Sequence, residues 1–178
     1  MPDQAEYIQE VARAARFGRV AICFVCAGNI CRSPMAEAVA KDGFARAEAR
    51  NISVSSAGTG SWHLGQDADW RARAALAGHG LELLSHRAKK YQDSWSPELD
   101  LVVALDRANY ADLARLSGLS REPHKLVLLR TFGGGARGRG NDEALDVPDP
   151  YLGSEADFEA TLEIIRASMA EVVKMFSA

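Results

Sequence analysis

The chain has 178 residues, of which 47% are hydrophobic and 25% are charged, and its formal net charge is −3. This length and composition suit one globular domain with a sizeable apolar core. The pI of about 5.8 gives no general case for nucleic-acid binding, and no apolar run is long enough to cross a bilayer. We therefore expect neither nucleic acid nor a membrane as a partner.

The cysteine content and the N-terminal residues indicate the cellular location of the protein. All three cysteines lie between positions 23 and 31, and an odd number in so short a stretch disfavours a disulfide framework. Residues 1–19 carry acidic side chains and lack the apolar region of a secretory signal. Both observations predict a cytoplasmic protein, because thiols stay reduced in that compartment.

Two helical patterns lie at the ends of the chain. Residues 1–18 are expected to be an N-terminal extension, and Ile8, Val11 and Ala15 recur there at helical spacing. A domain over 19–178 follows. Its last helix is predicted to begin near Ser154, whose spacing to Asp157 resembles a capping box. One face of that helix carries the apolar stripe Phe158, Leu162, Ile165, Met169, Val172 and Phe176.

Strand and helix patterns alternate between these ends. Strands are predicted over 20–25, 52–56, 99–105 and 125–129. Further helices are predicted to open at Ser33–Pro34 and to cover 70–77 and 108–116. The alternation predicts a single-domain α/β fold, a three-layer, doubly wound sheet of four parallel strands with helices on both faces.

A short motif joins the first strand to the helix that follows it. Residues 26–32 read Cys-Ala-Gly-Asn-Ile-Cys-Arg. Gly28 and Asn29 tolerate the left-handed backbone of a tight loop, so the N–H groups of 27–31 can turn inward and bind an anion at the helix N-terminus. Arg32 has a planar fork of donors that matches two phosphate oxygens. The motif predicts a site for a phosphate ester.

Cys26 is the candidate nucleophile of this loop. An unperturbed thiol is only about 3% thiolate at neutral pH, but cysteines near a helix N-terminus and an arginine can fall to a pKa of roughly 3.5 to 7.5. A hydroxyl such as that of Ser33, donating to the sulfur, would favour the thiolate further. The alternative is a small buried residue ahead of a surface charge.

Asp149 is the candidate proton donor. It lies between Pro148 and Pro150, whose rings restrict the backbone, and it follows the glycine-rich segment 133–140, which we expect to be mobile. A carboxyl group can protonate an aryl leaving group and later activate water. The alternative is an ordinary polar turn.

These residues resemble the low-molecular-weight protein tyrosine phosphatases over nearly all of 19–178. The match consists of a first motif and a distal Asp-Pro-Tyr, namely Cys26, Gly28, Asn29, Cys31, Arg32, Ser33, Pro34, Met35, Ala36 and Glu37, then Asp149, Pro150 and Tyr151. The resemblance implies that Cys26 is the nucleophile, Arg32 the phosphate clamp and Asp149 the general acid. It implies phosphotyrosine-containing protein substrates, inhibition by inorganic phosphate and other oxyanions, and no cofactor or metal.

The resemblance also implies supporting roles. Ser33 would tune the thiolate, and Ser56 and His86 would hold Asn29, although His86 could equally be a surface histidine. Trp62 and Tyr151 would form the aromatic walls of the cleft, the alternative for Trp62 being partial burial in the core. Cys31 would form a reversible disulfide with Cys26. Leu152 departs from the second tyrosine that often follows Asp-Pro-Tyr.

Three other functions remain as alternatives. Thioredoxin-coupled arsenate reduction uses cysteines well downstream of the loop, and none follows Cys31 here. A non-catalytic phosphate-binding module would need neither a thiolate nor an acid. Protein arginine phosphatases carry threonine at the loop position of Ile30, whereas a bulky aliphatic residue there accompanies phosphotyrosine activity. We therefore predict kcat/KM to fall in the order phosphotyrosine, phosphoarginine, phosphoserine.

Overall fold

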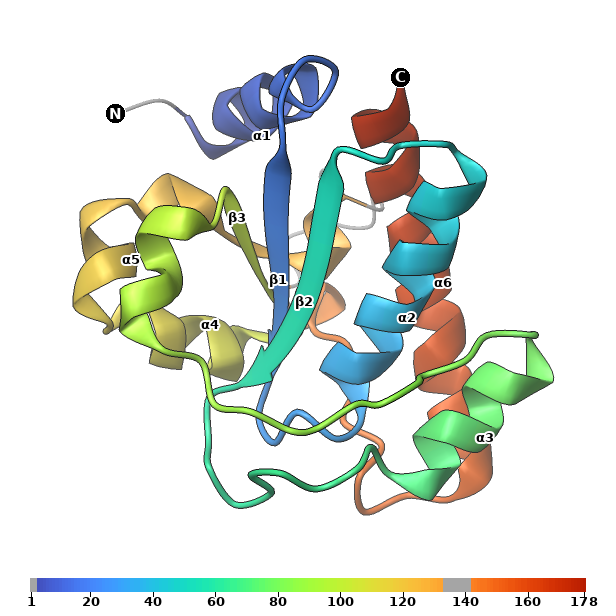
Figure 1. Ribbon diagram of the computed structural model, residues 1–178. Coiled ribbons are helices and arrows are strands. Elements are labelled where there is room, and N and C mark those ends of the chain that lie inside the picture. The colour runs from blue at the N-terminus through green and yellow to red at the C-terminus, as the bar shows by residue number, and fades with distance from the viewer. Residues whose placement is uncertain (1–2, 133–141) are drawn as a thin grey trace.

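The computed structural model describes residues 3–132 and 142–178, and the segment 133–140 that we expected to be mobile lies outside them. Four parallel strands form one sheet in the order β2-β1-β3-β4 (Figure 1). The strands are β1 (Val20–Cys26), β2 (Ile52–Gly58), β3 (Leu101–Ala104) and β4 (Leu126–Leu128). The helices are α1 (Gln4–Ala14), α2 (Arg32–Arg46), α3 (Trp70–Gly78), α4 (Arg107–Ala114), α5 (Ser117–Arg121) and α6 (Glu155–Ser177), with short 3₁₀ turns η1 (Asp93–Glu98), η2 (Pro123–Lys125), η3 (Leu129–Thr131) and η4 (Asp142–Leu145).

Helices cover both faces of the sheet. Along β1, Ile22 and Phe24 pack into a large apolar cluster with residues of α2, α3 and α6, while Cys23 and Val25 pack into a smaller cluster with residues of α4 and α5. Figure 1 shows the same division, with α2, α3 and α6 on one side of the strands and α4 and α5 on the other. The predicted three-layer, doubly wound fold is confirmed.

The second helix begins slightly earlier than predicted. It starts at Arg32, with Cys31 as the preceding cap residue, rather than at Ser33–Pro34. Pro34 is tolerated in the first turn because the N–H groups there have no intrahelical partner to lose. The loop therefore feeds into the helix without a spacer, and Arg32 belongs to both.

The third strand is shorter than predicted. Of the predicted 99–105, only Leu101–Ala104 pairs as β3, because η1 occupies the chain up to Glu98 and Asp106 already caps α4. The fourth strand is likewise trimmed from 125–129 to Leu126–Leu128 by the flanking turns η2 and η3. Helix α5 was not predicted, because five residues are too few to show a helical period.

Helix α6 closes one layer and follows the predicted pattern. The Ser154 backbone N–H donates to the Asp157 carboxylate at 2.6 Å, which is half of a capping box. The predicted stripe is buried in full, from Phe158 to Phe176. Within the described residues, no helix is both long and apolar enough to span a bilayer.

Helix α1 packs at the amino ends of the strands, at the opposite end of the sheet from the loop that follows β1 (Figure 1). Ile8 and Val11 are buried in the large cluster. The Tyr7 hydroxyl donates to the Asp100 carbonyl at 3.1 Å, and its ring lies edge-on to His124. Burial and the charge of Asp100 raise the pKa of Tyr7 to about 12, so the phenol keeps its proton and its bond. The division into an extension (1–18) and a domain (19–178) stays a prediction.

Candidate active site

The loop 27–31 lies at the carboxyl end of the sheet, where parallel α/β sheets bind ligands. Asn29 has φ +56°, in the left-handed region, which reverses the chain between strand and helix. The Thr59 N–H donates to the Cys26 carbonyl at 2.8 Å and joins the start of the loop to the end of β2. Gly58 permits this approach, because a Cβ there would lie 2.6 Å from the Ala27 carbonyl oxygen.

Cys26 is buried beside a hydroxyl group. Its side chain belongs to the last residue of β1, and its Sγ lies 3.0 Å from the Ser33 Oγ. The Ser33 hydroxyl also lies 3.1 Å from the Ala57 carbonyl oxygen. Ser33 has one proton to donate, so a Cys26 thiol can donate to Ser33 while Ser33 donates to Ala57, and a thiolate can take the Ser33 proton instead. The contact suits the predicted role of Ser33.

Asn29 is fully buried and lies at the centre of the hydrogen-bond network behind the loop. Its amide nitrogen donates to the hydroxyls of Ser33 and Ser56, both at 2.9 Å. Its amide oxygen accepts from the Lys89 backbone N–H at 2.9 Å, and its carbonyl oxygen accepts from His86 Nε2 at 2.8 Å. Ser56 and His86 thus contact Asn29 as the resemblance implied.

Arg32 is held by two carboxylates and a carbonyl although it is almost fully buried. Nη1 donates to Asp106 at 2.5 Å and to the Val147 carbonyl at 3.0 Å, and Nη2 donates to Asp149 at 2.6 Å. Burial opposes the charge, but Cys26, Asp149 and Asp106 outweigh it, and the pKa of Arg32 lies above its ordinary value.

One donor of Arg32 is left over. Its Nε is buried and has no hydrogen-bond partner among the described residues. A buried unpaired N–H is costly, and such a group in a native protein is commonly explained by a ligand or by its function. Nε and Nη2 form one edge of the guanidinium, which is the edge that grips two oxygens of a phosphate. The geometry therefore suits an oxyanion in the loop.

Asp106 was not predicted from the sequence. It lies two residues after the end of β3, caps α4 by accepting the Asn109 N–H at 2.7 Å, and orients Arg32 with its other carboxylate oxygen. An acid placed immediately after a buried strand was the available signal, because the carboxyl ends of neighbouring parallel strands meet at one edge of the sheet.

The loop forms the floor of a cleft of about 310 Å³. Ten residues line it, and nine of them were predicted: Cys26, Ala27, Gly28, Ile30, Cys31, Arg32, Trp62, Asp149 and Tyr151. The tenth, His63, was missed. Its ring covers Gly28 closely, since a Cβ on Gly28 would lie 2.9 Å from His63 Cδ2, and it stands edge-on to Tyr151 with the ring centroids 5.8 Å apart.

Trp62 and Tyr151 stand at the mouth of this cleft. Trp62 is 71% exposed, so the alternative of partial burial in the core does not hold. Its ring lies over Gly60, where a Cβ would come within 1.9 Å of it. Tyr151 is 44% exposed, and its backbone N–H donates to Asp149 Oδ1 at 3.1 Å.

An ion pair ties the Asp149 segment to α3 and to the loop. Arg71 donates to the carbonyls of Tyr151 and Gly153 at 3.0 and 2.7 Å, and it pairs with Asp69 at 2.7 Å. The hydrogen bond from Arg71 lowers the pKa of Asp69 despite partial burial. The Asp69 N–H in turn donates to the Ile30 carbonyl at 2.8 Å. These contacts hold the acid, the start of α3 and the loop in one arrangement.

The second cysteine of the loop differs from the first in its surroundings. Cys31 is buried, and burial followed by the charge of Asp69 raises its pKa well above the ordinary value. Cys31 is therefore a protonated thiol at neutral pH.

The described residues contain one group whose ligand atoms converge enough for a metal ion: His79, Glu159 and Glu163. It lies between α3 and α6, outside the cleft, and Arg166 already contacts His79 Nδ1 at 2.8 Å. The absence of a metal or cofactor from the reaction stays a prediction.

Comparison with known proteins assigns the chain to a family. Residues 21–177 match the family model described as low molecular weight phosphotyrosine protein phosphatase. The low molecular weight protein-tyrosine-phosphatase of Streptomyces coelicolor is 47% identical over 151 residues, which cover 83% of this chain and 87% of that protein. The chain belongs to this family. The predicted family, and with it the prediction of a protein phosphatase, is confirmed.

Solved structures agree with this assignment. The crystal structure of YfkJ from Bacillus subtilis superposes with a TM-score of 0.78 at 28% identity, covering 89% of this chain and 95% of that one. An arginine phosphatase, YwlE, in a Cys-to-Ser variant with a phosphorylated active-site serine, gives a TM-score of 0.74 at 29% identity, with coverage of 87% and 94%. The fold thus also resembles a phosphatase named for a different phosphorylated residue.

The close contact at Gly58 predicts the effect of adding one methyl group. In Gly58→Ala the new Cβ would lie 2.6 Å from the Ala27 oxygen and 3.1 Å from the Asn29 nitrogen, and neither backbone atom can yield without moving the loop. We expect affinity for inorganic vanadate, measured by calorimetry, to fall at least about tenfold, because overpacking forces the backbone to shift. Gly78→Ala is the control, since nothing lies within 4 Å of that Cβ. Equal affinity in the two variants would contradict the prediction.

Proposed function

We propose that this protein is a protein tyrosine phosphatase that hydrolyses phosphotyrosine and small aryl phosphates through a phosphocysteine on Cys26. The observation that carries the proposal is that Cys26, Arg32 and Asp149 line one cleft, and that the buried Nε of Arg32 has no hydrogen-bond partner among the described residues. A module that only binds phosphate would need neither the thiol nor the acid. Phosphotyrosine-containing proteins are the proposed partners, with inorganic phosphate and related oxyanions as inhibitors.

In the first step the Cys26 thiolate attacks the phosphorus atom of the bound ester. The S–P bond forms as the bond from phosphorus to the phenolic oxygen breaks, and the Ser33 hydroxyl supports the thiolate beforehand. The loop N–H groups and Arg32 stabilise the charge on the equatorial oxygens in the transition state. This stabilisation requires little rearrangement, because the loop is already joined to β2 and α3.

Asp149 supplies the proton for the leaving group. In the free protein its carboxylate contacts Arg32 Nη2, and a phosphate oxygen that takes over this donor would free Asp149 to face the ester oxygen. Without the guanidinium beside it, the carboxylate can take up a proton from solvent and then pass that proton to the leaving oxygen. The side chain is 46% exposed and lies at the edge of the cleft, so it can make this change locally. In the second step the same group takes a proton from water, water attacks phosphorus, and the S–P bond breaks to release inorganic phosphate.

The walls of the cleft favour a flat, aromatic ester. Trp62 and Tyr151 flank the mouth, and Ile30 adds an apolar contact without a hydrogen-bond acceptor. A phosphoserine stem is too short to carry its phosphate to the floor. Phosphoarginine is the second candidate, because an arginine phosphatase superposes on this fold.

Cys31 provides a route to reversible oxidation. A sulfenic acid on Cys26 would condense with the Cys31 thiol, with loss of water, to give a disulfide that a thiol reductant restores. Both cysteines are buried and free in the described structure. Location in the cytoplasm, as the cysteine content predicts, would keep this pair reduced in the resting enzyme.

The phosphocysteine proposal is tested at Cys26 itself. We expect Cys26→Ser to lose turnover of p-nitrophenyl phosphate in the presence of a chelator while it still binds vanadate, because the loop donors remain. Rapid acid quenching of the wild type followed by mass spectrometry should find phosphate on the peptide that contains Cys26. Substantial turnover by Cys26→Ser would refute the assignment.

The role of Asp149 is tested with leaving groups of different pKa. In Asp149→Asn, hydrolysis of phosphotyrosine, whose leaving group has a pKa near 10, should fall by about 10² to 10⁴ in kcat, the usual worth of a general acid. Esters of much more acidic phenols should lose far less, because those groups leave without a proton. Asp146→Asn is a matched control, since Asp146 pairs with Arg107 outside the cleft lining. A uniform loss across the series would exclude the role.

Substrate class is tested at Ile30. We expect kcat/KM to fall in the order phosphotyrosine, phosphoarginine, phosphoserine, measured on peptides that differ only in that residue. Ile30→Thr should raise phosphoarginine activity, because its hydroxyl offers an acceptor to the guanidinium. Ile30→Val is the control for side-chain size alone. Similar rates on phosphotyrosine and phosphoserine peptides would contradict this description of the cleft.

A further inference from the structure

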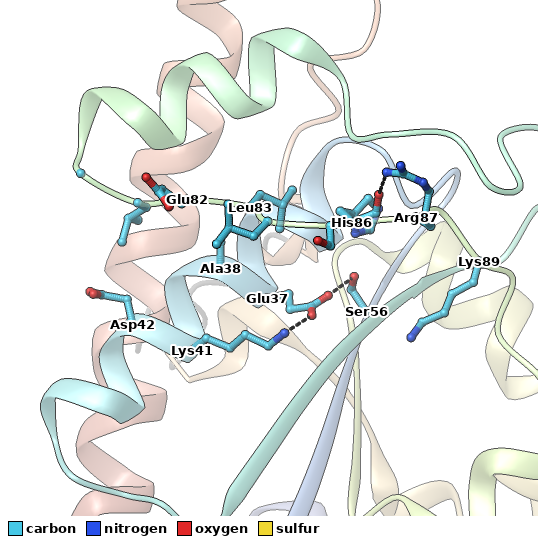
Figure 2. Close-up of a pocket in the computed structure, with 14 residues that line it drawn as sticks. Glu37, Ala38, Lys41, Asp42, Ser56, Glu82, Leu83, His86, Arg87 and Lys89 are labelled. Atoms are coloured by element: carbon cyan, nitrogen blue, oxygen red, sulfur yellow. Dashed lines mark hydrogen bonds and ion pairs between the residues drawn. The ribbon is translucent and has the colours of Figure 1, made fainter.

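A second, larger cavity lies next to the residues that hold Asn29. It has a volume of about 790 Å³ and is formed by α2 on one side and residues 80–89 on the other (Figure 2). Ser56 and His86, which both contact Asn29, belong to its lining, and so does Glu37 of α2. The reaction proposed above assigns no role to Glu37.

Glu37 divides its carboxylate between two donors. Oε2 accepts from the Ser56 hydroxyl at 2.5 Å, and Oε1 accepts from Lys41 Nζ at 2.5 Å, as the dashed lines in Figure 2 show. The Glu37 side chain is only 14% exposed, whereas that of Lys41 is 58% exposed. The bond to Ser56 is therefore the sheltered one, and an ionised acceptor makes it stronger than a neutral bond.

The direction of each proton in this network follows from the donors available. Ser56 gives its single proton to Glu37, so its oxygen can only accept from Asn29. The Asn29 amide has two hydrogens, one for Ser56 and the other for Ser33. Ser33 accepts from Asn29, so its single proton can go either to the Ala57 carbonyl at 3.1 Å or to the sulfur of Cys26 at 3.0 Å. When Cys26 is a thiolate, the sulfur accepts this hydrogen bond. A chain of oriented hydrogen bonds thus runs from Glu37 to the nucleophile.

We propose that Glu37 is a positioning residue for the proposed phosphatase reaction. Its carboxylate can only accept hydrogen bonds, so it orients the Ser56 hydroxyl, and Ser56 fixes the Asn29 amide in the orientation that presents Ser33 to Cys26. This inference rests on the proposed function. Glu37 does not touch the cleft, and it acts through the groups between it and the sulfur.

The simpler account is an ordinary pair on a helix surface. Glu37 and Lys41 stand four residues apart on α2, where such pairs contribute only about 0.3–0.5 kcal/mol of helix stability. The two accounts predict different results at Lys41. If only the ion pair matters, removing either partner has the same effect, whereas the positioning role depends on Glu37 and Ser56 and not on Lys41.

The test uses the full chain and two readouts. The first is the rate of alkylation of Cys26 by iodoacetamide at neutral pH, followed by mass spectrometry of its peptide, and the second is kcat and KM for p-nitrophenyl phosphate. Cys23 does not interfere, because burial raises its pKa to about 11. The alkylation rate needs no substrate, so it tests Glu37 even if the proposed function fails.

We expect Glu37→Leu to slow alkylation and to lower kcat by about tenfold, as the loss of one hydrogen bond of ordinary strength would do, with KM changing little. Glu37→Gln should recover most of the rate, because its amide oxygen can still accept from Ser56. Lys41→Met should match the wild type. If Glu37→Leu does not fold, as judged by circular dichroism, Glu37→Ala takes its place.

A double-mutant cycle completes the test. Ser56→Ala breaks the same chain, so Glu37→Leu combined with Ser56→Ala should be no slower than Ser56→Ala alone. Glu82→Gln, a second acid lining the cavity, serves as the matched control and should leave both rates unchanged. Additive losses in the double variant, or an equal loss in Lys41→Met, would overturn the proposal.

Discussion

The arrangement of the cleft depends on one buried amide group. Asn29 adopts a left-handed backbone conformation at the point where the loop turns, and its side chain meets three different parts of the chain: the start of α2, β2 and the segment before β3. The neighbours of this side chain require two hydrogen-bond donors, for Ser33 and Ser56, and one acceptor, for the Lys89 N–H. Aspartate would lack the donors and glycine would lack the side chain, so asparagine is the residue that satisfies both the backbone and the buried neighbours.

A second constraint is the charge balance around Arg32. A guanidinium this deeply buried is tolerable only with carboxylates beside it. Asp106 supplies one from the start of α4, and Asp149 supplies the other from the segment before α6. Asp106 is fixed by its role as the cap of α4, whereas Asp149 lies at the exposed edge of the cleft. Asp106 is thus held in place beside Arg32, whereas Asp149 is able to move away from it.

Much of the fold and of the candidate site was predictable from the sequence, because residues close together in the chain encode these features. The strand, loop and helix around Cys26 follow from residue types within fifteen positions, and the alternation of elements is enough to place four parallel strands. Asp106 and His63 were missed because their contacts with Arg32 and Gly28 join distant positions and leave no periodic pattern. Glu37 belongs to the sequence motif, but its hydrogen bond with Ser56 joins α2 to β2. Such a contact between distant positions can be identified only in the folded chain.

The contact between Asp149 and Arg32 has a consequence for turnover. In the free protein the carboxylate of Asp149 occupies a donor that a phosphate oxygen would otherwise use, so it is an internal competitor for the site. An oxyanion that takes this donor must displace Asp149, and the apparent affinity of that oxyanion is scaled down to the fraction of molecules in which the pair is open. After hydrolysis the same carboxylate can reclaim Arg32 and help to expel inorganic phosphate. Product inhibition would then be weakened by the same residue that we propose as the proton donor.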